Sequence, residues 1–569
     1  MPRCCIWIIA ILLLSDCYCK CYKNTYFTRI NRNKLLTITY DAADDLPPYV
    51  AALETVKKPI KEIYFFPGHC GGRYIPSSLQ RIMKNHGGFM YDLPELDGLD
   101  NIHAPEGPLL ESLQAASKLY DSLRTWYLVN GSTSGILAAI LAFIRIHQRY
   151  NTTALSDSPV FLIGKDSHKS VYDGLSLGQC DAVLLPCEYD REFGVPLGVS
   201  IQSIEAAIKE YKSRVAGLIL TRPSYQGVAY TSDSLKQIID LCHRNNVPVI
   251  IDEAHGSHLR FLNDPKLQDG LACGADVVVQ STHKTLTSLS QTGMLHVSKD
   301  AFKFNPSRDI QQSAVSVIQE CYSMVTSTSP NSLFLASLDA TTRQFSVHGR
   351  DMINEAKVAA THLRDTIRNY DFPAANKVVF LDDSVDVRSR SHLAVDPLRV
   401  SIKYNFRARK NSIETDDAMC DERGIYCELN LSDCISYGVP PGATVDTLLP
   451  LQEEIIRQCL TTSSLDQISH DFNQPTDVIE GYAERSQLAY IHIKDTVYKA
   501  PTAVLLANSI GKVSAETICL YPPGTPIISR GETINAAHVK LLKVAQSEAG
   551  SGCTITGSQD PTVKSINVY

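Results

Sequence analysis

The sequence predicts an α/β protein built around a mostly parallel sheet. Between Leu119 and Val297, short apolar runs alternate with stretches of helical periodicity, which is the pattern of strand–helix–strand units. One apolar run ends in an acid at Asp252, and a later run is followed directly by Ser281-Thr282-His283-Lys284. The carboxyl ends of parallel strands meet at one edge of a sheet, so both segments are expected at one site.

Six apolar runs are predicted to form the strands of this sheet. They are Trp126–Val129, Val160–Ile163, Val183–Leu185, Gly217–Leu220, Val247–Ile251 and Asp276–Val279. The last run is expected to deliver Ser281 to Lys284 into a loop. Between the last two runs, Leu235, Ile238, Ile239 and Cys242 recur at i, i+3, i+4 and i+7 behind the polar start at Thr231, which predicts a helix with one core-facing side.

The remaining chain is expected to form smaller units around this sheet. Strands near Leu398–Ile402 and Cys434–Val439 predict a smaller α/β domain, and the polar stretch from Thr461 to Thr476 predicts a linker to a last, α+β domain. The predicted division of the chain is 1–21 leader, 22–40 basic segment, 41–65 arm, 66–325 large domain, 326–460 small domain and 461–569 C-terminal domain.

Composition limits the classes of partner. The 569 residues are 44% hydrophobic and carry a net charge of -7, which gives no basic footprint for nucleic acid. The apolar run Ile6–Leu14 is too short to cross a bilayer and is typical of a secretory signal peptide. After leader removal, no membrane association is expected.

The segment after the signal peptide indicates a second targeting step. Lys20 to Tyr40 contains Lys, Arg, Asn and Thr but no acidic residue, as transit peptides do. Such a two-part leader resembles those that direct proteins to a secondary plastid; the alternative is a secreted enzyme with a basic propeptide. The cysteines beyond the leader lack framework spacing, which favours a reducing destination.

Lys284 is the predicted centre of the chemistry. A lysine behind a strand, among hydroxyl and imidazole groups, can be desolvated and become a nucleophile, although an isolated Ser-Thr-His-Lys is more often a solvated loop. A strand-end carboxylate such as Asp252 can pair with a pyridinium nitrogen. Together, Lys284 and Asp252 match what pyridoxal 5'-phosphate needs, namely an amine for its aldehyde and an acid for its ring nitrogen.

Several motifs in order resemble the prokaryotic-type ornithine/lysine/arginine decarboxylases of the aspartate-aminotransferase fold (pyridoxal phosphate fold type I), in a short form without a wing domain. The motifs are Asn130-Gly131-Ser132-Thr133-Ser134-Gly135, His168-Lys169-Ser170, Thr221-Arg222-Pro223-Ser224-Tyr225-Gln226-Gly227, Asp252-Glu253-Ala254-His255-Gly256, Gly274 through Lys284, Ser329-Pro330 and Tyr521-Pro522-Pro523-Gly524-Thr525-Pro526. They cover nearly the whole chain after about residue 65.

The resemblance implies a role for each site residue. Lys284 would hold the cofactor and Asp252 its ring nitrogen, while His168 would stack on the ring. His255 and Thr221 would lie near the phenolic oxygen. The phosphate would be held by Ser132 and Thr133 at a helix start, and by Ser281 and His283.

Glu428 matches the family's position for the acid that binds the distal cation of the substrate. If that pair is desolvated, breaking one side typically costs about 3 to 5 kcal/mol. A second acidic group, made of Asp92, Glu95 and Asp97, is expected on the approach to the site. One position departs from the family: Cys70 stands where the Pro-Gly-His-Lys-Gly-Gly motif has lysine.

The implied activity is decarboxylation of arginine, lysine or ornithine by a homodimer or larger homo-oligomer, in which Thr326 to Pro330 would contribute to the neighbouring subunit's phosphate site. The cofactor residues alone leave open another reaction of the same fold, aminotransfer or a lyase step. Arg399 would then hold the substrate's α-carboxylate, although its setting in Asp396-Pro397-Leu398-Arg399 resembles a structural strand. A catalytically lapsed, oligomeric paralogue is the third alternative.

Overall fold

The computed structural model describes residues 46–82, 86–150, 158–305, 309–372, 377–405, 412–431, 434–461, 488–496, 498–521, 524–548 and 554–569. The predicted signal peptide, the basic segment and most of the predicted linker lie outside the described residues. So do Pro522 and Pro523 of the C-terminal motif. No helix within these ranges is long and apolar enough to span a membrane.

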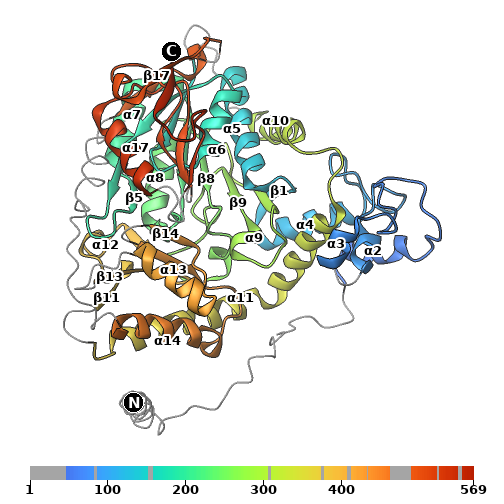
Figure 1. The fold of residues 1–569 in the computed structure, drawn as a ribbon. Coiled ribbons are helices and arrows are strands. Elements are labelled where there is room, and N and C mark those ends of the chain that lie inside the picture. The colour runs from blue at the N-terminus through green and yellow to red at the C-terminus, as the bar shows by residue number, and fades with distance from the viewer. Residues whose placement is uncertain are drawn as a thin grey trace, which may run out of the picture. The chain divides into compact units, whose positions relative to one another are not determined.

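An eight-stranded sheet in the order β1-β10-β9-β8-β6-β2-β3-β16 forms the centre of the fold (Figure 1). Its strands are β1 Ser122–Leu128, β2 Val160–Gly164, β3 Asp181–Leu185, β6 Val215–Thr221, β8 Val249–Asp252, β9 Val277–Gln280, β10 Gly293–Ser298 and β16 Ala489–Ile491. The five strands from β9 to β3 are parallel, whereas β10, β1 and β16 join antiparallel. The predicted, mostly parallel sheet is therefore confirmed.

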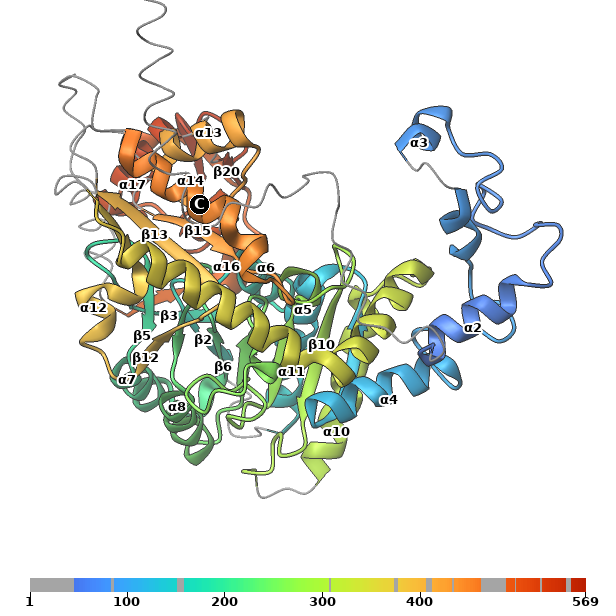
Figure 2. The same cartoon turned by 90° about the horizontal axis from the view of Figure 1, so that it is seen from below.

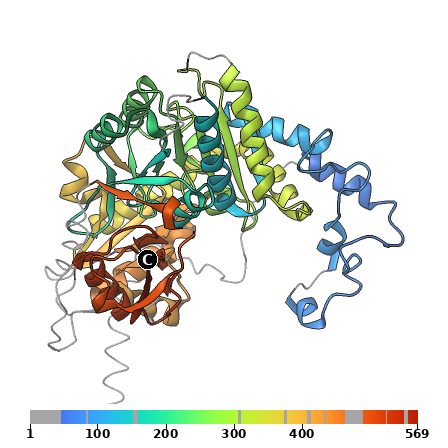
Figure 3. The ribbon, with the colours of Figure 1, turned by 90° about the horizontal axis from the view of Figure 1, so that it is seen from above.

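Helices cover both faces of this sheet. The side chains of each strand alternate in direction, so apolar residues point to both faces and are buried under helices on each. In β2, Val160 and Leu162 join the core cluster of α7 and α8, whereas Phe161 contacts Phe143 of α5 on the other face. The helices of this region are α4 Pro108–Tyr120, α5 Gly131–Tyr150, α6 Lys169–Leu177, α7 Ile201–Tyr211, α8 Ser232–Arg244, α9 Thr282–Thr285 and α10 Asp309–Val325. Helix α10 packs along α5 (Figure 3).

Helix α8 confirms the predicted helix between the last two parallel strands. Thr231 is its N-cap, with Oγ1 accepting a hydrogen bond from the Ser234 N–H. The four apolar residues at helical spacing, Leu235, Ile238, Ile239 and Cys242, are all buried.

A second sheet of four antiparallel strands, in the order β11-β13-β15-β14, lies beside α13 and α14 (Figure 2). The elements are β11 Lys377–Phe380, α12 Val385–Arg388, β13 Arg399–Asn405, α13 Ser412–Arg423, β14 Leu429–Leu431, β15 Cys434–Gly438 and α14 Val445–Thr461. The long helix α11, Ser332–Arg368, packs against both α4 and α14. The two strands predicted here, β13 and β15, are confirmed.

Near the N-terminus, α2 (Pro48–Lys57) and α3 (Ser77–Ile82) precede the large sheet, and α2 packs on α4 and α11. The C-terminal elements are α16 Ile493–Thr496, β17 Thr502–Leu505, β18 Ile518–Tyr521, β19 Thr525–Ile528, α17 Ala536–Glu548, β20 Thr554–Thr556 and β21 Ser565–Val568. They form two small antiparallel sheets, β17-β21 and β19-β18-β20. Short pairs also connect β4 (Cys187–Tyr189) with β5 (Pro196–Val199), and β7 (Val228–Tyr230) with β12 (Leu393–Val395). The predicted domain boundaries remain predictions.

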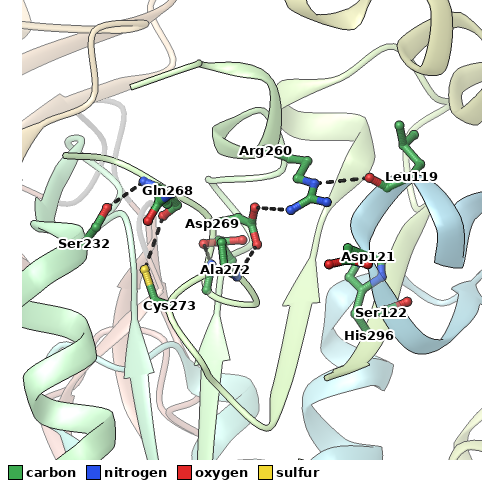
Figure 4. A network of polar contacts seen from close by, with 12 residues as sticks. Leu119, Asp121, Ser122, Ser232, Arg260, Gln268, Asp269, Ala272, Cys273 and His296 are labelled. Carbon is green, nitrogen blue, oxygen red and sulfur yellow. Dashed lines mark hydrogen bonds and ion pairs between the residues drawn. The ribbon is translucent and has the colours of Figure 1, made fainter. Parts of the chain in front are cut away.

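The connection between β8 and β9 carries a polar network that fixes the two strands bearing the site (Figure 4). Arg260 donates to the Leu119 carbonyl at 3.1 Å and pairs with Asp269 at 3.4 Å. The other carboxylate oxygen of Asp269 accepts from the Ala272 N–H at 3.0 Å. This network ties the crossover between the strands that precede Asp252 and Lys284 to α4.

Candidate active site

One cavity of about 510 Å³ lies at the carboxyl ends of the parallel strands and contains the whole predicted cofactor set. Its lining includes Ser132, Thr133, His168, Thr221, Asp252, His255, Ser281, His283 and Lys284. These residues come from the ends of β2, β6, β8 and β9 and from the start of α5. The structure therefore brings together all nine residues, which the sequence spreads over more than a hundred positions.

Lys284 lies in one turn of helix, α9, and not in the predicted loop, because the Leu286 N–H bonds to the Thr282 carbonyl at 2.8 Å. Its Nζ is 3.1 Å from His255 Nε2. The side chain is exposed to the cavity but surrounded by protein on most sides, and this burial lowers the pKa of Lys284. Asp252 and Glu428 oppose the shift. The amine is therefore easier to deprotonate than an ordinary lysine.

Asp252 is the last residue of β8 and is 4% exposed. Its Oδ1 accepts from the Ala254 N–H at 3.1 Å. Burial raises the pKa of its carboxyl, while His168 and Lys284 oppose this effect. A buried carboxyl of this kind ionises readily only beside a cation, and a protonated pyridine nitrogen is such a cation.

His168 caps the N-terminus of α6, and its Nδ1 accepts a hydrogen bond from the Ser170 N–H at 3.2 Å. Burial lowers the pKa of His168, so the ring is neutral at physiological pH. The next residue, Lys169, donates its N–H to the Gly524 carbonyl at 3.1 Å. The C-terminal motif around Gly524 therefore fixes the loop that carries His168.

Another part of the cavity lining, around the start of α5, offers donors that suit an anion. Gly131, at a φ of 74°, begins the twenty-residue helix α5, whose first N–H groups have no intrahelical partner. Ser281 Oγ lies 2.7 Å from Ser132 Oγ. His283 Nδ1 lies 2.6 Å from the Thr292 carbonyl, which fixes its ring beside them.

An unpaired hydroxyl supports the fit of a cofactor. Thr221 Oγ1, at the end of β6, is buried and has no hydrogen-bond partner within the described chain. Such an atom is costly unless a ligand satisfies it, and a phenolic oxygen would do so. With a strand-end acid, a reactive amine and an anion site in one cavity, the donor set fits pyridoxal phosphate. In the described ranges, no cluster of His, Cys, Asp or Glu is arranged to hold a metal ion.

Glu428 lies just before β14 and lines a second cavity of about 260 Å³, which also contains Lys284 and Arg399. Its carboxylate is exposed and accepts from the Tyr225 hydroxyl at 2.8 Å. The expectation of a desolvated acid therefore does not hold for the single chain, because solvent reaches this carboxylate. Its role toward a substrate stays a prediction.

The acidic residues predicted on the approach lie outside both cavities. Asp92 pairs with His69 at 3.2 Å, and Glu95 accepts from Asn101 at 3.4 Å. Neither these two nor Asp97 lines either cavity. Cys70, the departure from the family motif, is also outside them, with Sγ 3.6 Å from the Gly68 carbonyl.

Two site residues were not predicted from the sequence in their observed roles. Tyr225 packs its ring against His255, with 4.4 Å between ring centroids. Arg399, whose setting in the sequence resembles a structural strand, is buried and donates from Nη2 to His255 Nδ1 at 3.2 Å. The motifs containing both residues were recognised, but a motif match does not show which side chains turn toward a cavity.

The C-terminal segment also contributes to the cavity wall. Leu520, Gly524, Thr525 and Thr556 line it beside the cofactor set. In the sequence, the motif from Tyr521 to Pro526 is the signal for this contribution.

A lysine of lowered pKa and a strand-end carboxylate in one cavity of a mostly parallel sheet define an α/β protein with a candidate active site centred on that lysine. The model of the family "Orn/Lys/Arg decarboxylase, major domain" matches residues 47–402. The chain therefore belongs to the Orn/Lys/Arg decarboxylase family, and it is a carboxy-lyase.

Similar proteins agree with this membership. The arginine decarboxylase of Bacillus subtilis is 25% identical, with 89% of this chain and 94% of the relative covered. The inducible lysine decarboxylase of Escherichia coli K12 is 21% identical, with 88% and 77% covered. The crystal structure of the Francisella novicida lysine decarboxylase LdcF matches with a TM-score of 0.73 at 18% identity, covering 92% of this chain and 81% of that one, so the two share a fold.

Proposed function

We propose that this chain decarboxylates a basic amino acid, namely arginine, lysine or ornithine, with pyridoxal 5'-phosphate as its cofactor. The observation that carries the proposal is the amine of Lys284, which lies 3.1 Å from His255 in the same cavity as Asp252. Relatives named arginine and lysine decarboxylase, which cover most of this chain, support the substrate class.

When bound, the cofactor supplies an aldehyde that captures amines and a ring that accepts electrons from the substrate's Cα. Lys284 provides the amine for the aldehyde. Asp252 holds the proton of the ring nitrogen. The helix start at Ser132 and Thr133, with Ser281 and His283, would hold the phosphate, because N–H groups without an intrahelical partner and the hydroxyls of Ser132 and Ser281 lie together there.

The protein's part in the reaction is to orient the substrate. The neutral imidazole ring of His168 would stack on the cofactor ring. Tyr225 and His255, whose rings contact each other, line the cavity beside Lys284. Two carboxylates, those of Glu428 and Asp396, line the smaller cavity that shares Lys284. Asp396 is already paired with His258 at 3.0 Å, so Glu428 is the proposed partner for the distal cation of the substrate. Breaking the bond from Cα to the carboxylate releases CO2 and leaves its electron pair at Cα, which the ring of the bound cofactor would accept; a carboxylate that no cation holds is lost more easily.

The test is to incubate the cofactor-loaded chain with arginine, lysine and ornithine separately and to measure CO2 and the corresponding amine. One basic amino acid is expected to give stoichiometric CO2 and amine. If none is decarboxylated while the cofactor's visible absorbance is present, the decarboxylase proposal fails.

Aminotransfer is the second candidate, and the position of Arg399 is the observation that favours it. This arginine shares the 260 Å³ cavity with Lys284, as an arginine that binds an α-carboxylate would. The same incubations distinguish the two reactions. An aminotransferase would convert the amino acid to a keto acid without releasing CO2 and would need a keto-acid acceptor.

We also propose that the working enzyme is a homodimer or a larger homo-oligomer. Near the N-terminus, the apolar side chains of Tyr64, Phe66 and Tyr74 are 95%, 84% and 67% exposed, which suits an interface with a second copy. Thr326 to Pro330 is the proposed contribution to the neighbouring subunit's phosphate site. An active monomer in sedimentation velocity would contradict this assembly.

The two-part leader is proposed to carry the enzyme into the secretory route and on to a secondary plastid. Every cysteine that the structure describes is a free thiol, as expected in a reducing compartment. Fusing residues 1–40 to a fluorescent protein, in a cell with such a plastid, tests the route. Fluorescence in the medium would support the secreted alternative.

A further inference from the structure

Arg399 is a buried arginine that packs against two glycines. It is the first residue of β13, and only 5% of its surface is exposed. A Cβ at Gly227 would lie 2.6 Å from Arg399 Cβ, and a Cβ at Gly438 would lie 3.3 Å from Arg399 Nη1. Two glycines, Gly227 just before β7 and Gly438 at the end of β15, therefore make room for the buried side chain of Arg399 beside the active site.

The guanidinium determines which nitrogen of His255 can carry a proton. Arg399 Nη2 donates to His255 Nδ1 at 3.2 Å. An arginine has only donors and stays charged, so Nδ1 must accept and cannot hold a proton. Burial, and then the positive charges of Lys284 and Arg399, lower the pKa of His255 well below its usual value, so the ring is neutral. Its one proton is therefore at Nε2.

Nε2 faces the nucleophile. Lys284 Nζ lies 3.1 Å from it. An Nε2–H needs an acceptor, and an ammonium has none, whereas a free amine offers a lone pair. With the proton on Nδ1 instead, Nε2 would accept from an ammonium and stabilise the charged lysine. The tautomer of His255 thus selects between the reactive and the unreactive form of Lys284.

The other charges around Lys284 favour its ammonium form. Asp252 and Glu428 both raise the pKa of Lys284, whereas Arg399 and, most of all, burial lower it. Since the cavity exposes the lysine to solvent, burial alone does not guarantee a free amine. A specific contact that accommodates only the neutral amine is therefore useful at this position.

We propose that Arg399 is a positioning residue that fixes the Nε2–H tautomer of His255 and thereby keeps Lys284 as a free amine, ready to attack an aldehyde. This role rests on the proposed function in one respect only, namely that the aldehyde is that of pyridoxal 5'-phosphate. Arg399 acts here through His255, which differs from direct binding of a substrate carboxylate.

The test compares Arg399→Met with Arg399→Gln in the full chain freed of cofactor. Both variants remove the charge, but only glutamine keeps an N–H donor for His255 Nδ1. Competitive labelling with acetic anhydride across pH, with the Lys284 peptide quantified by mass spectrometry, measures the fraction of free amine. At neutral pH, Arg399→Met is expected to lower the labelling rate about tenfold or more. The loss in Arg399→Gln is expected to be clearly smaller, and Arg399→Lys should stay near the unmodified chain.

A second measurement needs no variant at Arg399. Solid-state ¹⁵N spectra of histidine-labelled chain, with the His255 signals identified by their loss in His255→Gln, report which ring nitrogen is protonated. A protonated Nδ1 in the unmodified chain would overturn the proposal, as would equal labelling losses in Arg399→Met and Arg399→Gln. A chain that decarboxylated no basic amino acid but kept this labelling contrast would lose the proposed function and retain the role of Arg399.

Discussion

Replacing Glu428 with glutamine removes the charge proposed to bind the distal cation of the substrate and keeps the size of the side chain. The carboxylate is exposed and bonded to Tyr225 at 2.8 Å, so the desolvated-pair value of about 3 to 5 kcal/mol does not apply. A hydrogen bond to a charged group contributes about 1.5 to 3 kcal/mol. At about 1.4 kcal/mol for each power of ten, kcat/KM for the preferred basic substrate should fall about ten- to a hundredfold.

The assay measures CO2 release from that amino acid and from an uncharged analogue of similar length, such as norleucine. The analogue has no cation to leave unpaired, so Glu428→Gln should change its kcat/KM little. Tyr225→Phe is the matched control, because it removes the hydroxyl that donates to Glu428 but keeps the charge of the Glu428 carboxylate. Equal losses for both substrates in Glu428→Gln would refute the specificity argument. A loss near a thousandfold for the basic substrate alone would mean that a second subunit or the substrate itself desolvates the carboxylate.

Four further changes test individual parts of the site. Lys284→Ala should abolish turnover and the visible absorbance of bound cofactor, and a borohydride-reducible adduct in that variant would contradict its role. Asp252→Asn should keep the absorbance but lower decarboxylation by orders of magnitude, because an unprotonated ring is a poor electron acceptor; near-normal turnover would remove Asp252 from this role. Thr221→Val should weaken cofactor binding about two- to tenfold in a fluorescence titration, and it should not lower the thermal midpoint of the cofactor-free chain, since Thr221 Oγ1 has no partner in the described chain. Burial lowers the pKa of His296 from 6.5 to about 3, so the unfolded chain binds a proton there that the native chain excludes. This contribution to stability is complete above pH 6.5 and is lost as the pH falls toward 3, by up to about 1.4 kcal/mol per pH unit. The free energy of urea unfolding should therefore differ less between pH 7 and pH 5 in His296→Gln than in the unmodified chain.

The large sheet and its cofactor residues were predictable because local pattern and family motifs agree there. Buried strands such as β9 are apolar throughout, and α8 shows a clear helical period behind an N-cap at Thr231. Residues at the carboxyl ends of parallel strands lie at one edge of the sheet, so the sequence alone predicts that Asp252 and Lys284 lie together.

The interactions within the site were less predictable, because they depend on side-chain direction and solvent exposure. The contact between Arg399 and His255 joins residues 144 positions apart, and nothing in the sequence around Asp396 distinguishes an inward arginine from an outward one. The exposure of Glu428 likewise depends on the loop before β14 and not on its motif. The single helical turn of α9 was missed because four residues are too few to show a period.

The short strand β16 has a consequence for how the protein reaches its native state. Its residues Ala489–Ile491 pair with Leu184, Val183 and Ala182, so a segment late in the chain completes the large sheet (Figure 3). Until the ribosome has made it, β3 is an open edge with unpaired N–H and C=O groups, which invites pairing with other chains. Expression of a fragment that stops at residue 461 should therefore yield aggregates, and adding the missing segment as a separate peptide should reduce them.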